Sequence, residues 1–253
     1  MQRSLVGSEM CIRDRYMLFD WQWYMPCTSH DGDATKVVDK LDMPRVVAYG
    51  KEKGVGIWVY VNQHALMKQM RELFPLLRQW GIVGVKSGFV QYASHRWATW
   101  LHDMVRLAAE NHLLMNIHDE YRPSGFSRTY PNLLTQEGIR GDEESPSLDQ
   151  AIYTLYNRMI CGAGDYTNCY FAERVTEKMG GRAAQLAKLV AIYSPWQFVY
   201  WYDRPEKSPR RAGGAGSAES VIKTDAATRF YNSIPTVWDE TRFLDGEMGK
   251  YVV

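Results

Sequence analysis

Carboxylate side chains are concentrated in one short stretch of this chain. In glycoside hydrolysis, one protonated carboxyl group donates its proton to the leaving oxygen while another carboxylate activates water or attacks the sugar. Carboxylate oxygens are also the ligands that Ca²⁺ prefers. A solvated loop is the alternative interpretation, because charged side chains usually face water. The acidic residues of this stretch are Asp119, Glu120, Glu137, Asp142, Glu143 and Glu144, with His118, Arg122 and Arg140 among them.

Two apolar runs lead directly into the acidic stretch. Residues 113–117 predict a buried strand that ends at His118, and Leu133 with Leu134 predicts a second strand that ends before Glu137. In a parallel α/β sheet the loops after the strands converge at one edge, where catalytic groups are usually placed. We therefore expect a site at that edge, with His118 as a ligand-contacting residue.

The rest of the chain repeats a strand–loop–helix pattern. About six or seven such units predict a parallel sheet of the α/β class, and a (β/α)8 TIM barrel is its expected closed form. The count falls short of eight, so either the first strand lies upstream of Tyr16 or one unit is irregular. The expected strands are 16–24, 56–61, 82–89, 113–117, 133–134 and 196–202, and the expected helices are 37–49, 66–77, 97–108, 148–159 and 177–192.

Composition excludes several classes of function. A net charge of +1, with no basic run, argues against nucleic acid or an anionic membrane as a partner. No run reaches the roughly 18 apolar residues that a membrane span needs. The four cysteines lack metal-site spacing and indicate no disulfide framework. Neither a His-x-His pair nor a GxSxG elbow is present, which disfavours amidohydrolase and serine-nucleophile chemistry.

The ends of the chain are expected to lie outside the barrel. Residues 1–15 lack the long apolar segment of a signal peptide, and we interpret them as a non-native leader. Residues 16–234 are the predicted barrel, and 235–253 are the predicted start of a truncated C-terminal β-domain. The Gly/Ser-rich stretch 213–220 lacks the ending of a phosphate loop and predicts a flexible loop instead.

Four segments carry a resemblance to a known family. HDEYRPSGFSRTYPNLLTQEGIRGDEE (118–144), VGVKSGFVQ (83–91), SPWQFVYWYDRP (194–205) and PTVWDETRFLDGEMGKY (235–251) together resemble glycoside hydrolase family 97. The resemblance covers residues 16–253. It implies a retaining or inverting α-glucosidase or α-galactosidase, with a (β/α)8 barrel between two β-domains and an active-site Ca²⁺. It also implies that this chain is a fragment lacking the N-terminal domain and its first barrel strand, and that the full-length parent is periplasmic or otherwise exported.

The resemblance assigns roles to individual residues. The general acid falls on Glu143 of RGDE, and one calcium ligand falls on Glu137. The carboxylate that serves as base and calcium ligand in inverting members falls on Asp119, with Glu120 beside it. The nucleophile of retaining members falls on Gly88, so we predict inversion. A Glu that inverting members place near the end of the preceding strand is also missing, since that region reads Asn62, Gln63, His64.

The resulting hypothesis is a Ca²⁺-dependent, exo-acting α-glycosidase whose substrate is an oligosaccharide or another α-glycoside. The alternative is a carbohydrate-binding barrel with impaired catalysis, which the missing carboxylates near Gln63 and at Gly88 would explain. Oligomeric state is left open. The predicted substrate-binding residues are Asp20, Trp21, Lys86, His118, Arg122 and Tyr130.

Overall fold

A parallel sheet organises the N-terminal half of the molecule. The computed structural model describes residues 8–11, 16–119, 121–170, 174–201 and 225–253. Five consecutive strands pair side by side in parallel, which confirms the predicted α/β class. They are β2 (Tyr16–Phe19), β3 (Gly56–Asn62), β4 (Gly84–Gly88), β5 (Leu114–Ile117) and β6 (Leu133–Gln136).

Three further strands extend this sheet from β2. Strand β1 (Ser8–Cys11) runs antiparallel to both β2 and β8 (Phe198–Trp201), and β7 (Thr167–Asn168) runs parallel to β8. Residues 1–15, which we interpreted as a leader, therefore contribute strand β1. This strand runs antiparallel to its neighbours, whereas all strands of a (β/α)8 barrel are parallel. An isolated parallel bridge also joins Gln136 to Gly164, just before β7. Closure into a (β/α)8 barrel and the three domain boundaries remain predictions.

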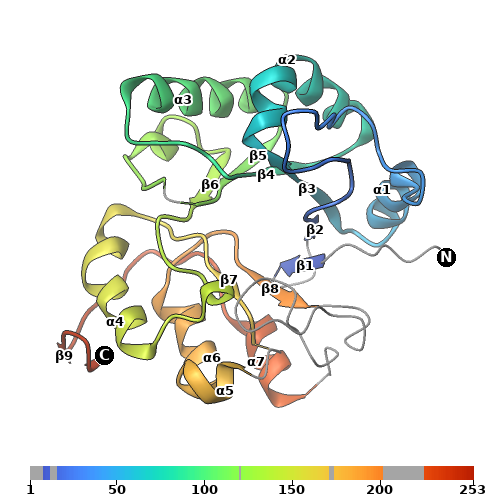
Figure 1. The fold of residues 1–253 in the computed structure, drawn as a ribbon. Helices are drawn as coiled ribbons and strands as arrows, with labels where there is room; N and C mark the ends of the chain where they lie inside the picture. The colour runs from blue at the N-terminus through green and yellow to red at the C-terminus, as the bar shows by residue number, and fades with distance from the viewer. Residues whose placement is uncertain (1–7, 12–15, 120, 171–173, 202–224) are drawn as a thin grey trace.

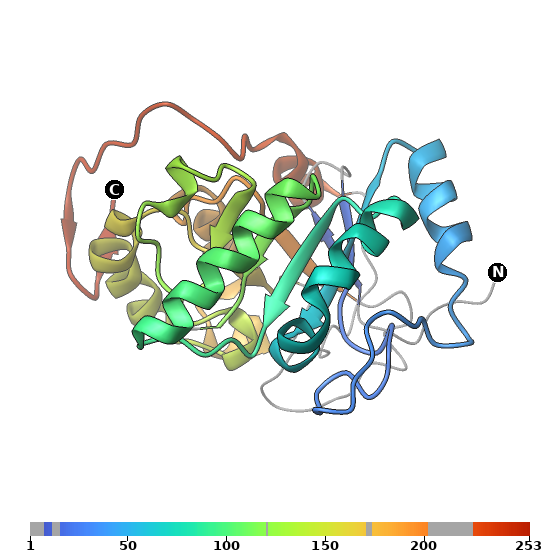
Figure 2. The ribbon, with the colours of Figure 1, turned by 90° about the horizontal axis from the view of Figure 1, so that it is seen from above.

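Three helices cover the parallel strands on their outer side (Figure 1). Helix α1 begins later than the predicted helix 37–49, because the Asp42 side chain accepts a hydrogen bond from the Arg45 amide and Pro44 occupies the first turn. Pro44 therefore lies in the first turn of the helix. Figure 2 shows α2 and α3 side by side over the sheet. The bounds are α1 (Met43–Glu52), α2 (Gln63–Trp80) and α3 (His95–Glu110).

The described helices of the C-terminal half are shorter than α2 and α3. The predicted helix 177–192 is split in two, because Gly180 and Gly181 both adopt positive φ angles, 79° and 82°. After α7 the chain crosses the outside of the molecule and reaches α4 (Figure 2), where the Tyr156 hydroxyl donates to the Tyr251 carbonyl at 3.1 Å. The bounds are α4 (Leu148–Asn157), α5 (Arg174–Lys178), α6 (Gly181–Ala191), α7 (Ala226–Ser233), β9 (Gly246–Glu247) and β10 (Tyr251–Val252).

The largest core lies between the parallel strands and helices α1–α3. Each large apolar side chain buried there contributes about 1.5–3 kcal/mol. An aromatic contact joins the N-terminal and C-terminal halves, because Trp58 of β3 stacks on Trp196 with ring centroids 4.1 Å apart. A Cβ atom at Gly84 would lie 2.4 Å from the Trp58 ring, so this packing requires glycine. No described helix is long and apolar enough to cross a membrane. Core residues include Leu66, Leu73, Phe74, Leu77, Val85, Leu101 and Met104.

Candidate active site at the strand ends

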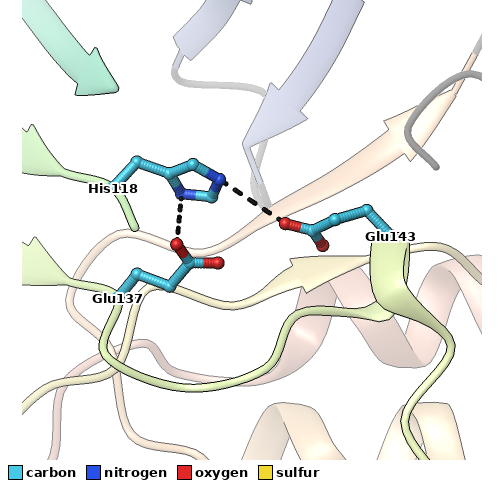
Figure 3. A group of neighbouring side chains, drawn as sticks. All are labelled: His118, Glu137 and Glu143. Carbon is cyan, nitrogen blue, oxygen red and sulfur yellow. Dashed lines mark ion pairs between the residues drawn. The ribbon is translucent and has the colours of Figure 1, made fainter. Parts of the chain in front are cut away.

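His118 lies between two carboxylates at the carboxyl ends of β5 and β6 (Figure 3). Its Nδ1 atom lies 3.3 Å from Glu137 Oε2, and its Nε2 atom lies 3.5 Å from Glu143 Oε1. His118 follows β5, Glu137 follows β6, and Glu143 lies on the short 3-10 helix η2 (Asp142–Glu144). One ligand atom from each residue lies within 4.8 Å of those of the other two. The structure thus brings together three of the residues that the sequence singled out.

A fourth residue, Asp165, joins this group and was missed by sequence reasoning. Its Oδ2 atom lies 2.8 Å from His118 Nδ1, and the side chain is fully buried. Asp165 lies just before β7, in the segment CGAGDY. The sequence did offer one sign of a site here, because Asp165 follows Gly162 and Gly164 and comes shortly before a strand. We call His118, Glu137, Glu143 and Asp165 the mouth cluster.

The charges of the mouth cluster are tightly coupled. Burial acts to lower the pKa of His118, but the surrounding carboxylates, Glu137 first, outweigh it and hold the pKa well above its usual value. Burial raises the pKa of Glu137 well above its usual value. Burial also acts to raise the pKa of Glu143, but the contact with His118 prevails and lowers it. Among the chain's own groups, Glu137 therefore retains a proton more readily than Glu143.

Two buried oxygens of the mouth cluster have no hydrogen-bond partner among the described residues. They are Glu143 Oε2 and Asp165 Oδ1. Buried polar atoms are almost always bonded, so these oxygens are candidates for contact with a ligand, an ion or water. Crowded carboxylates with a free oxygen fit a hard cation such as Ca²⁺, whose usual ligands are oxygens.

Asp119 lies beside the mouth cluster, and one of its carboxylate oxygens is bonded outside that cluster. Its backbone amide donates to Glu137 Oε2, and its own Oδ2 accepts from the Val90 amide at 3.1 Å. The residue adopts a positive φ of 68°, an uncommon conformation that often marks functional sites. Glu120, the neighbouring candidate, lies outside the described residues.

Asp20, Lys86 and Trp21 form a second polar and aromatic group at the strand ends. Lys86 Nζ lies 3.2 Å from Asp20 Oδ2, and both side chains are largely buried. The other oxygen of Asp20 is buried without a partner among the described residues. Trp21 is 44% exposed, and its ring centroid lies 5.7 Å from that of Phe89, which is 53% exposed. Phe89, which follows β4, was not among the predicted residues.

The two remaining predicted residues make their described contacts with residues outside the mouth cluster. Tyr130 packs on Phe126, which in turn stacks on His102 with ring centroids 3.9 Å apart. Arg122 is exposed, and its Cγ atom lies close to Gly138. Among the described residues, no hydrogen bond or ion pair joins either side chain to His118, Glu137 or Glu143, and their substrate-binding roles stay predictions.

Comparison with known proteins decides the family. Residues 12–139, half of the chain, match the family described as Glycoside hydrolase 97. The chain belongs to the glycoside hydrolase 97 family. A retaining alpha-galactosidase of Bacteroides thetaiotaomicron is 29% identical over 255 residues, covering 94% of this chain and 36% of that protein. A probable retaining alpha-galactosidase of Streptomyces bingchenggensis is 29% identical over 241 residues, with the same coverage. The chain thus spans about a third of the length of these relatives.

Solved structures of glycoside hydrolase 97 enzymes share the fold. An enzyme from Pseudoalteromonas sp. strain K8, solved in complex with panose, superposes with a TM-score of 0.72 at 23% identity. The match covers 91% of this chain and 39% of that one. The same enzyme in complex with acarbose gives a TM-score of 0.71. A beta-arabinopyranosidase, at 20% identity, also gives 0.71 and covers 94% of this chain and 38% of its own.

Within this glycoside hydrolase 97 chain, Tyr60 fills the space beside Gly88. A Cβ atom at Gly88 would lie 2.3 Å from Tyr60 Cε2 and 2.7 Å from the Tyr60 hydroxyl. Tyr60 is buried in β3, and burial raises the pKa of its hydroxyl, with the charge of Asp20 adding to the effect. A side chain at position 88 is therefore incompatible with the present position of the Tyr60 ring.

Proposed function

We propose that the protein hydrolyses α-glycosidic bonds, with an oligosaccharide or another α-glycoside as substrate. The observation that carries the proposal is the Glu143 carboxyl group, which His118 holds beside Glu137 and which keeps one buried oxygen without a partner among the described residues. The family, the α-galactosidase names of two relatives, and the panose and acarbose complexes of related enzymes support a sugar substrate.

In this proposal Glu143 donates a proton to the glycosidic oxygen, and Asp119 activates the attacking water. Glu120 is the neighbouring alternative to Asp119. Asp20 and Lys86 hold sugar hydroxyl groups, since one Asp20 oxygen is buried without a partner among the described residues. Trp21 and Phe89 offer exposed rings against which a sugar ring packs. His118 keeps Glu143 in place through the 3.5 Å contact.

Ca²⁺ is the proposed cofactor, with Glu137 and Asp119 as its ligands. The crowding of Glu137 against neighbouring carboxylates, which raises its pKa together with burial, supports a cation at this position. Bound Ca²⁺ would supply the positive charge that keeps Glu137 ionised. The general-acid role requires Glu143 to carry a proton, which burial favours and the contact with His118 opposes.

We propose exo-action with inversion of the anomeric configuration, although the two named relatives are retaining enzymes. The support is steric, because the position of the expected nucleophile is Gly88 and Tyr60 fills the adjacent space. Proton NMR of the first product formed tests this part. The β-anomer released from an α-glycoside supports inversion, and the α-anomer contradicts it.

The variant Glu143→Gln tests the general acid in the full-length protein. We expect kcat/KM for an α-linked disaccharide to fall by about 100-fold or more, because its leaving group needs the proton. A nitrophenyl α-glycoside, which has a good leaving group, should lose far less. Glu144→Gln is the matched control, since Glu144 is exposed and pairs with Arg140 at 2.8 Å. No turnover by the unmodified protein, or equal losses on both substrates, would contradict the proposal.

A further inference from the structure

The residue that precedes Glu143 on η2 is bonded to a different part of the molecule. Asp142 is fully buried, and both of its carboxylate oxygens are hydrogen-bonded. Oδ1 accepts from the Tyr166 hydroxyl and lies 3.2 Å from Lys188 Nζ. Oδ2 accepts from the Cys169 amide at 3.1 Å. We call Asp142, Tyr166 and Lys188 the anchor cluster.

The anchor cluster joins three separate elements. Asp142 lies on η2, Tyr166 directly precedes β7, and Lys188 lies on α6. Lys188 Nζ also donates to the Tyr166 hydroxyl at 3.0 Å, so the three side chains form a closed triangle of contacts. The side chains of Lys188 and Asp142 are 5% and 0% exposed. Water therefore competes little for these bonds.

Among the described residues, the anchor cluster supplies the most buried contacts of η2. This helix has three residues, no side-chain cap at its N-terminus, and a left-handed residue, Ser145, directly after it. Besides the pair of Asp142 with Lys188, the described residues of η2 form the pair of Glu143 with His118 and the pair of Glu144 with Arg140, which is exposed on both sides. A buried ion pair gains little net stability, but in some proteins it selects one particular arrangement of the chain. Here that arrangement places Glu143 against His118.

We infer that Asp142, Tyr166 and Lys188 are positioning residues that hold η2 where Glu143 meets His118. The inference rests on the proposed function, because it assigns the three residues an effect on proton donation by Glu143. None of them contacts the substrate in this role. Displacement of a catalytic group by about 1 Å lowers rates by about 100-fold, so a loosened η2 should impair the step that needs the proton.

Two variants of the full-length protein test the inference, Lys188→Met and Tyr166→Phe. Each should lower kcat/KM for an α-linked disaccharide by about tenfold to 100-fold. The loss for a nitrophenyl α-glycoside should be less than about threefold, and KM should change little, because only proton donation depends on Glu143. Lys188→Arg should restore part of the loss. Arg140→Met, which removes the exposed ion pair of the same helix, should leave both rates unchanged.

The outcomes separate the two proposals. A thermal melt establishes that each variant is folded, and Tyr166→Phe replaces Lys188→Met if the latter unfolds. Unchanged rates, or equal losses on both substrates, would overturn the positioning role when Glu143→Gln shows the expected dependence on leaving group. If Glu143→Gln itself shows no such dependence, the proposed function fails and the inference fails with it.

Discussion

The mouth cluster and the anchor cluster meet at η2, and they differ in how completely their carboxylates are bonded. Both oxygens of Asp142 in the anchor cluster have donors within the chain. In the mouth cluster, Glu143 Oε2 and Asp165 Oδ1 are buried without a partner among the described residues. Buried polar groups are normally satisfied, and those that are not store strain or take part in function. The comparison thus separates a carboxylate whose two oxygens are both bonded within the chain from carboxylates that each keep one oxygen without a described partner.

The largest expected effect on stability comes from breaking the anchor cluster. Asp142→Ala leaves the Lys188 charge buried beside no carboxylate, and we expect a loss of about 3–5 kcal/mol in the free energy of unfolding. Urea denaturation measures it. Asp103→Ala is the matched control, because Asp103 pairs with Arg106 at 2.8 Å with both side chains about half exposed. That loss should stay below about 1 kcal/mol. If both variants lost less than about 1 kcal/mol in the free energy of unfolding, the anchor cluster would not differ from an exposed ion pair.

A smaller effect is expected from adding a carboxylate near the mouth cluster. Gly88→Asp forces the Tyr60 ring to move, and we expect it to destabilise the protein by about 1–3 kcal/mol. Because the two positions share one space, the double variant with Tyr60→Ala should lose less than the sum of the single losses. A double-mutant cycle by urea denaturation should give a coupling energy above about 0.5 kcal/mol. Strict additivity would show that Tyr60 does not fill this space.

The smallest effect should come from Asp33, a satisfied carboxylate nearer the surface. It accepts from Gln69 at 2.7 Å and from Thr35, and it pairs with Lys36 at 2.8 Å. Lys36 is the largest of the contacts that hold the pKa of Asp33 below its usual value. The resulting stability is present above the unfolded pKa, about 3.9, and is lost as the pH falls toward the folded pKa.

The variant Asp33→Asn tests whether the ionised Asp33 side chain stabilises the fold. In urea unfolding at pH 7 the variant should be less stable than the unmodified protein, and the difference should shrink at pH 3. A difference that stays constant or grows at pH 3 would show that the charge of Asp33 does not stabilise the fold.

Most of the parallel sheet was predictable from periodicity. The predicted strand 56–61 differs from β3 by one residue, and the buried face of α3 contains Leu101, Met104 and Ala108 as expected. The predicted helix boundaries were wrong where the local backbone geometry determined where a helix begins or ends. Pro44 and the Asp42 cap start α1 later than its apolar residues indicated, and Gly180 ends α5. The two-residue strand β7 carries too little apolar pattern to be predicted at all.

The site was predictable to the extent that it follows strand ends. Glu137 and Glu143 lie beside His118 because β5 and β6 are adjacent and parallel, which the apolar runs indicated. Asp165 could not be placed in the same way. It is separated from His118 by 47 positions, and their contact depends on where β7 joins the sheet. Phe89 was missed because an aromatic residue at a strand end resembles a core residue, whereas its ring is half exposed.

The most direct test measures kcat/KM for an α-linked disaccharide together with the free energy of unfolding for Glu143→Gln. An unsatisfied carboxylate that serves catalysis should be removable without loss of stability. We therefore expect activity to fall by about 100-fold or more, while the free energy of unfolding stays within about 0.5 kcal/mol of the unmodified protein or rises. Undiminished activity, or a loss of activity accompanied by destabilisation as large as that of Asp142→Ala, would contradict a catalytic role for Glu143.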